Sequence, residues 1–194
     1  MSRENSETRE RILASAWELL MEAGPAAVRM SDIARRTGIS RQAVYLHFPS
    51  RAELLIATTR YIDEVKDVDA RLAASRAADD GLERLDAFIE AWGNYIPEIH
   101  GVARALIDLQ AKDEAAQAAW ADRMDAVRHG CRAAVAALAR DGRLTGDLSE
   151  DEAADLLWSQ LSVESWEVLR LRCGWTQARY IEAMQQMARR TLTA

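Results

Sequence analysis

The stretch from Arg29 to Leu55 constrains the fold more than any other part of this 194-residue chain. Its pattern predicts one short helix over about residues 31–37 and a second over about 41–47. Between them, Gly38 stands where a helix ends in a residue with positive φ, a conformation that glycine adopts cheaply. Ser40 is a good N-cap for the second helix. Two short helices joined by such a turn form a helix-turn-helix, whose second helix enters the DNA major groove.

The charge of this stretch differs from that of the whole chain. Residues 29–51 carry five arginines and one acid, Asp32, whereas the chain has a formal net charge of −6. A basic segment on an acidic protein is typical of a phosphate-binding face. The alternative, from the residues alone, is a small three-helix packing motif whose arginines are only solvated.

Individual residues make the pattern more specific. They are Ile33-Ala34, Gly38-Ile39-Ser40, the run Val44-Tyr45-Leu46-His47-Phe48-Pro49-Ser50-Arg51 and Glu53-Leu54-Leu55, with Ile12-Leu13, Ala16 and Gly24 upstream. On these residues the segment resembles the DNA-binding domain of the TetR family of bacterial transcriptional regulators. The close match covers about residues 8–55, and beyond it only the length and the helical pattern agree.

The sequence departs from the family pattern at two positions. Arg29 stands where a threonine usually caps the helix that follows, so a side-chain cap and its phosphate contact are not expected there. Leu46 stands where a polar or aromatic residue is usual, so one contact to the DNA backbone is not expected. Neither departure breaks the predicted fold.

The second helix of the motif and its flanks supply the expected DNA contacts. The candidate residues are Ser40, Arg41, Gln42, Tyr45, His47 and Arg51. Arginine bonds bidentately to guanine and glutamine to adenine, so Arg41 and Gln42 are the candidates for base readout. The resemblance implies that Tyr45, His47 and Arg51 hold phosphates and set the register. Ser40 is expected to combine capping with a phosphate contact.

The rest of the chain has helical periodicity without strand-like alternation, so the predicted class is all-α, with about nine helices. The expected domains are a helix-turn-helix DNA-binding domain over residues 1–52 and a helical ligand-binding and dimerisation domain over 53–194. Residues 1–7 are expected to form a loose arm. One long helix is expected from Arg51 to about Ala74, and Pro97 is expected to close or kink the next one.

Composition and cysteine count narrow the class of protein. The chain is 49% hydrophobic and 29% charged, which is typical of a globular domain. An apolar run of 18 residues and an apolar N-terminal segment are both missing, so neither a membrane span nor a secretory signal is expected. Cys131 and Cys173 lie far apart without a motif and are expected to be buried free thiols in a reducing cytoplasm.

The helix expected over about residues 151–172 is apolar around most of its circumference, and such a helix must be covered on both sides. We therefore expect a two-fold dimer in which it and the last helix, about 177–192, form a four-helix bundle with their copies, as the resemblance also implies. The expected interface residues are Leu156, Leu157, Leu161, Trp166, Tyr180, Met184 and Met187. The dimer would read a palindrome with half-sites about 34–36 Å apart. The alternative is a monomer in which this helix is plain core.

The resemblance also implies a small-molecule site among the central helices of the second domain. Such pockets are mostly apolar with a few polar anchors. The candidate lining residues are Trp92, Tyr95, Ile96, His100, Trp120, Met124 and Trp158. The cluster at residues 92–97 is the strongest, because its proline interrupts a helix where a cavity can open. A hydrophobic or aromatic ligand is expected, although each residue taken alone also fits core or interface.

Two other classes of function compete with a regulator. A helical-bundle enzyme with a di-metal site needs paired Glu-x-x-His motifs, and these are missing, as are P-loop, G-x-S-x-G and CxxC patterns. Neither a metal nor another cofactor is therefore expected. The second competitor is a helical protein-interaction module without sequence-specific DNA binding. The function that the resemblance implies is a regulator, by family default a repressor, that a ligand releases from its operator.

Overall fold

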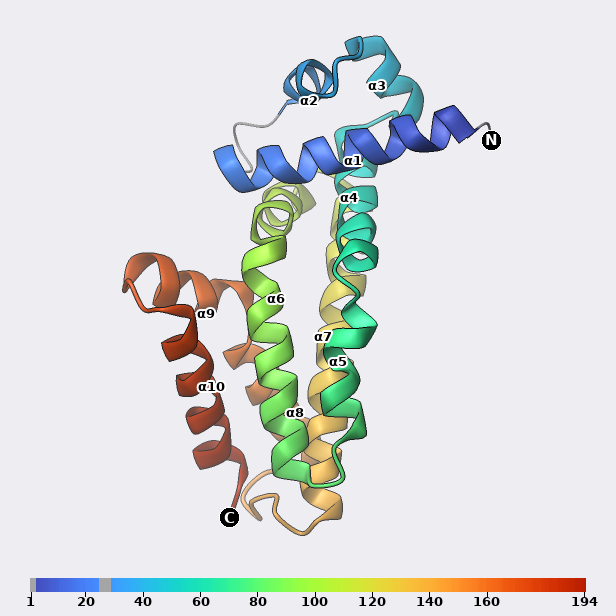
Figure 1. Cartoon of the computed structure of the whole chain (residues 1–194). Helices are drawn as coiled ribbons and strands as arrows, with labels where there is room; N and C mark the ends of the chain where they lie inside the picture. The colour runs from blue at the N-terminus through green and yellow to red at the C-terminus, as the bar shows by residue number, and fades with distance from the viewer. Residues whose placement is uncertain (1–2, 25–28) are drawn as a thin grey trace. The chain divides into compact units, whose positions relative to one another are not determined.

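The computed structural model describes residues 3–24 and 29–194. This part of the chain is all-α, as predicted, with ten α-helices, one π-helical turn and no strand (Figure 1). The elements are α1 (Arg3–Ala23), α2 (Met30–Thr37), α3 (Arg41–His47), α4 (Arg51–Val65), α5 (Val68–Ala77), α6 (Gly81–Gln110), α7 (Glu114–Arg140), α8 (Glu150–Gln160), α9 (Val163–Glu167), η1 (Val168–Arg172) and α10 (Gln177–Leu192). They form two compact units. The first unit comprises residues 1–67 and 98–122, and the second comprises 68–97 and 123–194.

α1 is the helix of the first unit that contacts both the helix-turn-helix and the helix after it. It packs against α2 and α4, and α2 packs against α3. Its buried face carries Ile12, Leu13, Ala16 and Leu20, which recur at helical spacing. A Cβ at Gly101 of α6 would lie 2.6 Å from the Leu20 carbonyl oxygen, so only glycine allows α6 to approach the end of α1 this closely. The two short helices of the motif therefore rest on a packed support.

α6 continues through Pro97 and does not end there. Proline has no N–H, and it leaves the carbonyl four residues earlier, that of Gly93, without its helical partner. The Gln177 side chain of α10 supplies that partner, because its Nε2 donates to the Gly93 carbonyl at 2.9 Å. A contact between residues 84 positions apart thus satisfies the backbone at the proline.

Three predictions of helix boundaries are wrong. Residues 3–7 belong to α1 and do not form a loose arm, whereas residues 1 and 2 lie outside the described part of the chain. The long helix predicted from Arg51 breaks after α4, where Asp67 has a φ of 45°, a conformation that aspartate tolerates better than most residues. The helix predicted over 151–172 breaks at Ser162, whose hydroxyl caps α9.

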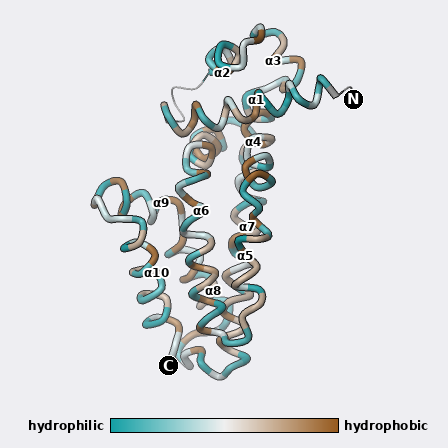
Figure 2. Tube along the Cα trace, viewed as in Figure 1, coloured by the Kyte–Doolittle hydropathy of each residue, from teal (hydrophilic) through white to brown (hydrophobic). Residues whose placement is uncertain are grey.

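Hydrophobic and hydrophilic residues are interleaved along the labelled helices (Figure 2), as expected of amphipathic helices packed in a globular protein. None of the described helices combines the length and the apolar character that crossing a membrane requires.

Candidate DNA-binding helix and ligand cavity

The turn between α2 and α3 has the geometry that the sequence predicted. Gly38 follows α2 with a φ of 75°, and the Ile39 N–H donates to the Ala34 carbonyl at 3.1 Å. The Ser40 hydroxyl then accepts a hydrogen bond from the Ala43 N–H at 3.1 Å and caps α3. The glycine ends one helix and the serine starts the next, which fixes the angle between the two.

The outer side of α3 is polar and exposed. Arg41, Gln42 and Tyr45 are all exposed, and residues four apart on a helix share a face. The Arg41 guanidinium carbon lies 5.4 Å from the centroid of the Tyr45 ring, and its Nη2 donates to the Tyr45 hydroxyl at 3.4 Å. Leu46 beside them is 81% exposed, although it is apolar. α3 therefore presents donors and one apolar side chain from a single short helix.

The remaining DNA-binding candidates flank the end of α3. His47 is half-buried, with its ring centroid 6.4 Å from that of the buried Phe48. Arg51 is the first residue of α4, next to Ser50, whose hydroxyl accepts from the Glu53 N–H at 3.1 Å. The six candidates, Ser40 to Arg51, thus lie on one continuous stretch that runs from the N-cap of α3 to the first residue of α4.

Ion pairs reduce the positive charge of the basic segment. Arg36 of α2 donates to both carboxylate oxygens of Glu22 in α1, at 2.7 and 2.8 Å. Arg35 pairs with Asp32 at 2.8 Å. Asp32 also accepts from the Arg29 backbone N–H at 3.1 Å, which is the half of a capping box that an acid three residues on supplies, whereas the Arg29 side chain accepts no cap hydrogen bond where a threonine would. Arg36 pairs with an acid from outside the segment, and counting charges between 29 and 51 does not reveal that pair.

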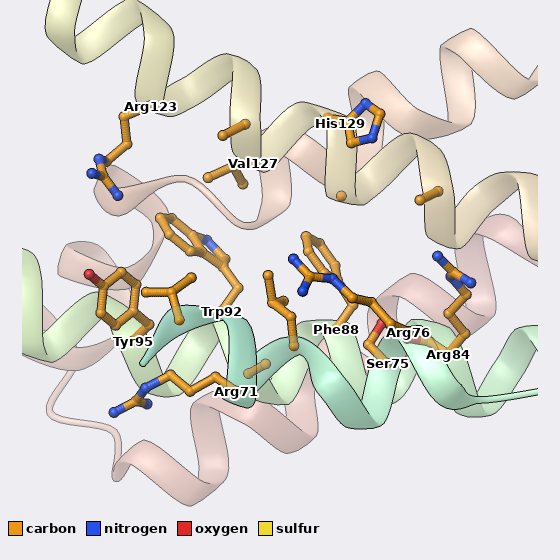
Figure 3. A pocket seen from close by; sticks show the side chains of 16 residues that line it. Arg71, Ser75, Arg76, Arg84, Phe88, Trp92, Tyr95, Arg123, Val127 and His129 are labelled. Carbon is orange, nitrogen blue, oxygen red and sulfur yellow. Dashed lines mark hydrogen bonds between the residues drawn. The ribbon is translucent and has the colours of Figure 1, made fainter. Parts of the chain in front are cut away.

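The second unit contains a cavity of about 470 Å³ between α5, α6 and α7 (Figure 3). This volume is within the usual range for small-molecule sites. Most of its side chains are either apolar or aromatic, or carry the positive charge of an arginine. The lining residues are Val68, Arg71, Leu72, Ser75, Arg76, Arg84, Phe88, Ala91, Trp92, Tyr95, Arg123, Ala126, Val127, His129, Gly130 and Ala133.

Comparison with known proteins assigns the N-terminal part of the chain to a family. The family model "Bacterial regulatory proteins, tetR family" matches residues 12–58. The HTH-type transcriptional regulator CymR of Pseudomonas putida is 29% identical over 181 residues, which cover 87% of this chain and 80% of that protein. The activator FasR of Mycolicibacterium smegmatis is 35% identical over 91 residues, 46% of this chain and 41% of FasR. A crystal structure of a transcriptional regulator from Saccharomonospora viridis in complex with choline aligns with a TM-score of 0.83, at 23% identity, over 97% of this chain and 99% of that one.

Residues 12–58 of the chain form a DNA-binding domain of the TetR family. The family and these relatives are transcriptional regulators and not enzymes, so this TetR-family chain is a DNA-binding transcriptional regulator of the helix-turn-helix class. The predicted family and fold class are confirmed. The relatives include an activator, so membership of the family leaves the sign of regulation open.

The cavity of this TetR-family regulator includes two of the seven candidate ligand residues. Trp92 and Tyr95 line it, and the Trp92 indole N–H donates to the Leu161 carbonyl at 2.8 Å. The other five candidates are outside the described lining: Ile96, His100, Trp120, Met124 and Trp158. Of these, His100 and Trp120 belong to the first unit.

Sequence reasoning missed the cationic part of the lining. Arg71 and Arg76 come from α5, Arg84 from α6 and Arg123 from α7. Surface arginines on amphipathic helices are common, and no local pattern distinguishes those that face a cavity. The four arginines are spread over 53 residues and three helices without a motif, so only the tertiary structure brings them together.

The seven candidate dimer residues fall into two groups. Leu156 of α8 and Met187 of α10 are exposed. The other five are buried within the chain itself: Leu157, Leu161, Trp166, Tyr180 and Met184. Two further large apolar side chains, Val168 and Leu171 of η1, are exposed. The exposed apolar side chains of this region thus come from α8, η1 and α10.

The two cysteines are free thiols in different environments. Burial raises the pKa of the Cys131 thiol to about 12, which keeps it protonated and inert at neutral pH. Cys173, at the end of η1, is exposed, so the prediction of two buried thiols is wrong for this residue.

Proposed function

We propose that this TetR-family regulator binds a palindromic operator as a homodimer, acts by default as a repressor, and is released from DNA by a small molecule bound in the cavity of the second unit. The observation that carries the DNA-binding part is α3, a Ser40-capped helix with Arg41, Gln42 and Tyr45 exposed on it. A short polar helix held by its cap against buried Val44 fits the major groove.

The residues of α3 divide into base contacts and phosphate contacts. Arg41 and Gln42 in its first turn would read bases, through guanine O6 and N7 and adenine N6 and N7. Tyr45, His47 and Arg51 would hold phosphates, which supplies affinity and register without sequence information. The stacking of Arg41 on Tyr45 supports this division, because it orders the guanidinium before DNA arrives.

Dimerisation would involve the region of α8, η1 and α10. Its exposed apolar residues, which a partner could contact, are Leu156, Val168, Leu171 and Met187. The other candidates are buried in the core of the chain itself. Monomeric proteins seldom expose several large apolar side chains in one region. A two-fold dimer would present two α3 helices to successive major grooves, which is what a palindrome requires.

The effector would shift an equilibrium between two dimer conformations. It would bind better to the one that does not fit successive grooves, by no more than its differential affinity. α6 is the element that we propose to carry the shift, because its residues 81–97 belong to the second unit and 98–110 to the first. The predicted domain over residues 1–52 would then bind DNA, and the predicted domain over residues 53–194 would bind the effector and form the dimer.

The test begins by selecting the DNA fragments that the protein retains from its own genome. The recovered inverted repeat is then titrated against the wild type, Arg41→Ala and Tyr45→Ala by fluorescence anisotropy. Each variant should lose about 10- to 100-fold in operator affinity, while sedimentation still shows a dimer. A protein-interaction module predicts instead that no inverted repeat is bound more tightly than random duplex at moderate salt. That result, or a monomer, would contradict the proposed function.

A further inference from the structure

The cavity of the second unit is cationic although the chain is acidic. Four arginines are among its 16 lining residues, and aspartate and glutamate are not. The chain as a whole carries a net charge of −6. Figure 3 shows Arg76 next to Phe88 and Arg84 beyond it toward one end of the cavity, and Arg71 and Arg123 beside Tyr95 toward the other. The field inside such a cavity favours an anion and opposes a cation.

The end formed by Arg76 and Arg84 is the better prepared to bind a charge. Arg84 is half-buried, and its side chain makes neither an ion pair nor a hydrogen bond with the described residues. A partly buried charge is stabilised when an anion pairs with it. Arg76 pairs with Asp69 at 2.9 Å, but the two side chains are 55% and 87% exposed, so a ligand can replace Asp69 at little cost.

The Tyr95 end is occupied by a contact within the protein. The Arg71 guanidinium carbon lies 5.5 Å from the centroid of the Tyr95 ring, which engages its face in a cation–π interaction. A ligand head group there would compete with this stacking. The two ends therefore differ, and the anion is expected beside Arg84.

Between the two ends the cavity is apolar and aromatic. Phe88, Trp92 and Val127 are buried, and Leu72 adds to the lining from α5. A Cβ at Gly130 of α7 would collide with Phe88 Cε2 and Cζ, so only glycine lets the ring approach α7 this closely. This stretch accommodates an apolar or aromatic body, as the predicted ligand class requires.

We propose that the cavity binds an amphipathic carboxylate, with its carboxylate held by Arg76 and Arg84 and its apolar body along Phe88 and Trp92. The planar forks of two guanidinium groups match the two oxygens of a carboxylate. A singly charged head group is also less costly to desolvate in a largely apolar cavity than a doubly charged phosphate. The inference rests on the proposed effector site and narrows its ligand from a hydrophobic molecule to an anion.

Three probes with one phenylbutyl body and different head groups test the inference: 4-phenylbutyrate, 4-phenyl-1-butanol and 4-phenylbutylamine. Calorimetric titration of the full chain should show the carboxylate binding at least about tenfold more tightly than the alcohol, with the amine weakest. The double variant Arg76→Gln/Arg84→Gln should lose about tenfold or more for the carboxylate and keep its affinity for the alcohol. Retained alcohol binding shows that the cavity is still folded.

Two matched double variants serve as controls. Arg132→Gln/Arg190→Gln removes the same charge from exposed positions of the second unit outside the cavity lining, and should leave carboxylate binding unchanged. Arg71→Gln/Arg123→Gln removes it from the Tyr95 end and should weaken the carboxylate less than the Arg76 and Arg84 pair does. Equal binding of the three probes, no binding of the carboxylate, or a larger loss at the Tyr95 end would overturn the inference.

An operator titration separates this inference from the proposed function. If the carboxylate binds with the expected arginine dependence but operator affinity is unchanged at saturation, the proposed effector response is wrong and the inference stands. If the alcohol or amine releases the operator as well as the carboxylate does, the response stands and the inference is wrong.

Discussion

Two groups of arginines in this protein are built in opposite ways. The basic segment places Arg35, Arg36, Arg41 and Arg51 within 17 residues, on α2, α3 and the start of α4. The cavity collects its four from α5, α6 and α7 over 53 residues. The first group is visible to anyone who reads the sequence, and the second exists only after folding. One group of arginines can therefore be recognised from the sequence, whereas the other can be recognised only from the tertiary structure.

Acids of the protein pair with members of both groups, and in the cavity Arg76 pairs with Asp69. Arg35 and Arg36 are engaged by Asp32 and Glu22, whereas Arg84 in the cavity has no such partner among the described residues. Local charge counting overestimates the first group and misses the second. The difference shows that arginine function depends on tertiary partners more than on density along the chain.

The largest expected effect concerns α7, on which the cavity depends. Cys131 follows Gly130 and is fully buried, and burial raises its pKa from 9.0 to about 12. Because only the thiolate reacts and burial also blocks access to the sulfur, the native protein at pH 8 should alkylate Cys131 far more slowly than the exposed Cys173. Mass spectrometry after iodoacetamide treatment should find Cys173 modified and Cys131 intact, and both modified in denaturant. Rapid native labelling of Cys131 would mean that α7 is not packed as described.

A glycine substitution at the cavity should have the next largest effect. Gly130→Ala places a methyl group against Phe88 and should push the ring into the cavity. We expect 4-phenylbutyrate affinity to fall by about tenfold or more, at a stability cost of about 1–3 kcal/mol from overpacking. Gly146→Ala is the matched control, because a Cβ there meets no atom within 4 Å. Unchanged binding by Gly130→Ala would show that Phe88 does not shape the ligand site.

The smallest expected effect concerns the paired arginines of the basic segment. Arg36→Ala should change operator affinity less than about threefold, because the guanidinium is already engaged by Glu22 and a partly exposed pair contributes only about 0–1 kcal/mol. Arg41→Ala, five residues on, is the comparison. A loss at Arg36 as large as that at Arg41, in the same anisotropy titration, would show that the pair opens on DNA.

The sequence was sufficient where the structure depends on near neighbours. The Gly38 turn, the Ser40 cap and the paired bonds of Ser149 and Glu152 that begin α8 all join residues a few positions apart, and all are present. Their chemistry is contained in a short stretch of chain, so propensity and spacing predict it.

The predictions that failed depend on residues far apart or on one unusual backbone angle. Of the two outcomes expected at Pro97, an end or a kink, the structure excludes the end, because nothing nearby in the sequence indicates that Gln177 will satisfy the Gly93 carbonyl and let α6 continue. The helical periodicity of the sequence continues across Asp67 and Ser162, so it predicted one helix at each place where the structure has a break. Aspartate and serine are also found inside helices, so neither residue marks a break by itself. The same limit applies to the ligand site, where aromatic residues at 92 and 95 were predicted and the arginines around them were not.

The central claim is that two separate arginine groups bind two different anions, and one set of titrations tests it directly. Wild type, Arg41→Ala and Arg76→Gln/Arg84→Gln are each titrated with the selected operator and, separately, with 4-phenylbutyrate. The account predicts that Arg41→Ala loses operator affinity and keeps the carboxylate, and that the cavity variant loses the carboxylate and keeps the operator. A single variant that loses both, or a cavity variant that still binds the carboxylate like wild type, would contradict it.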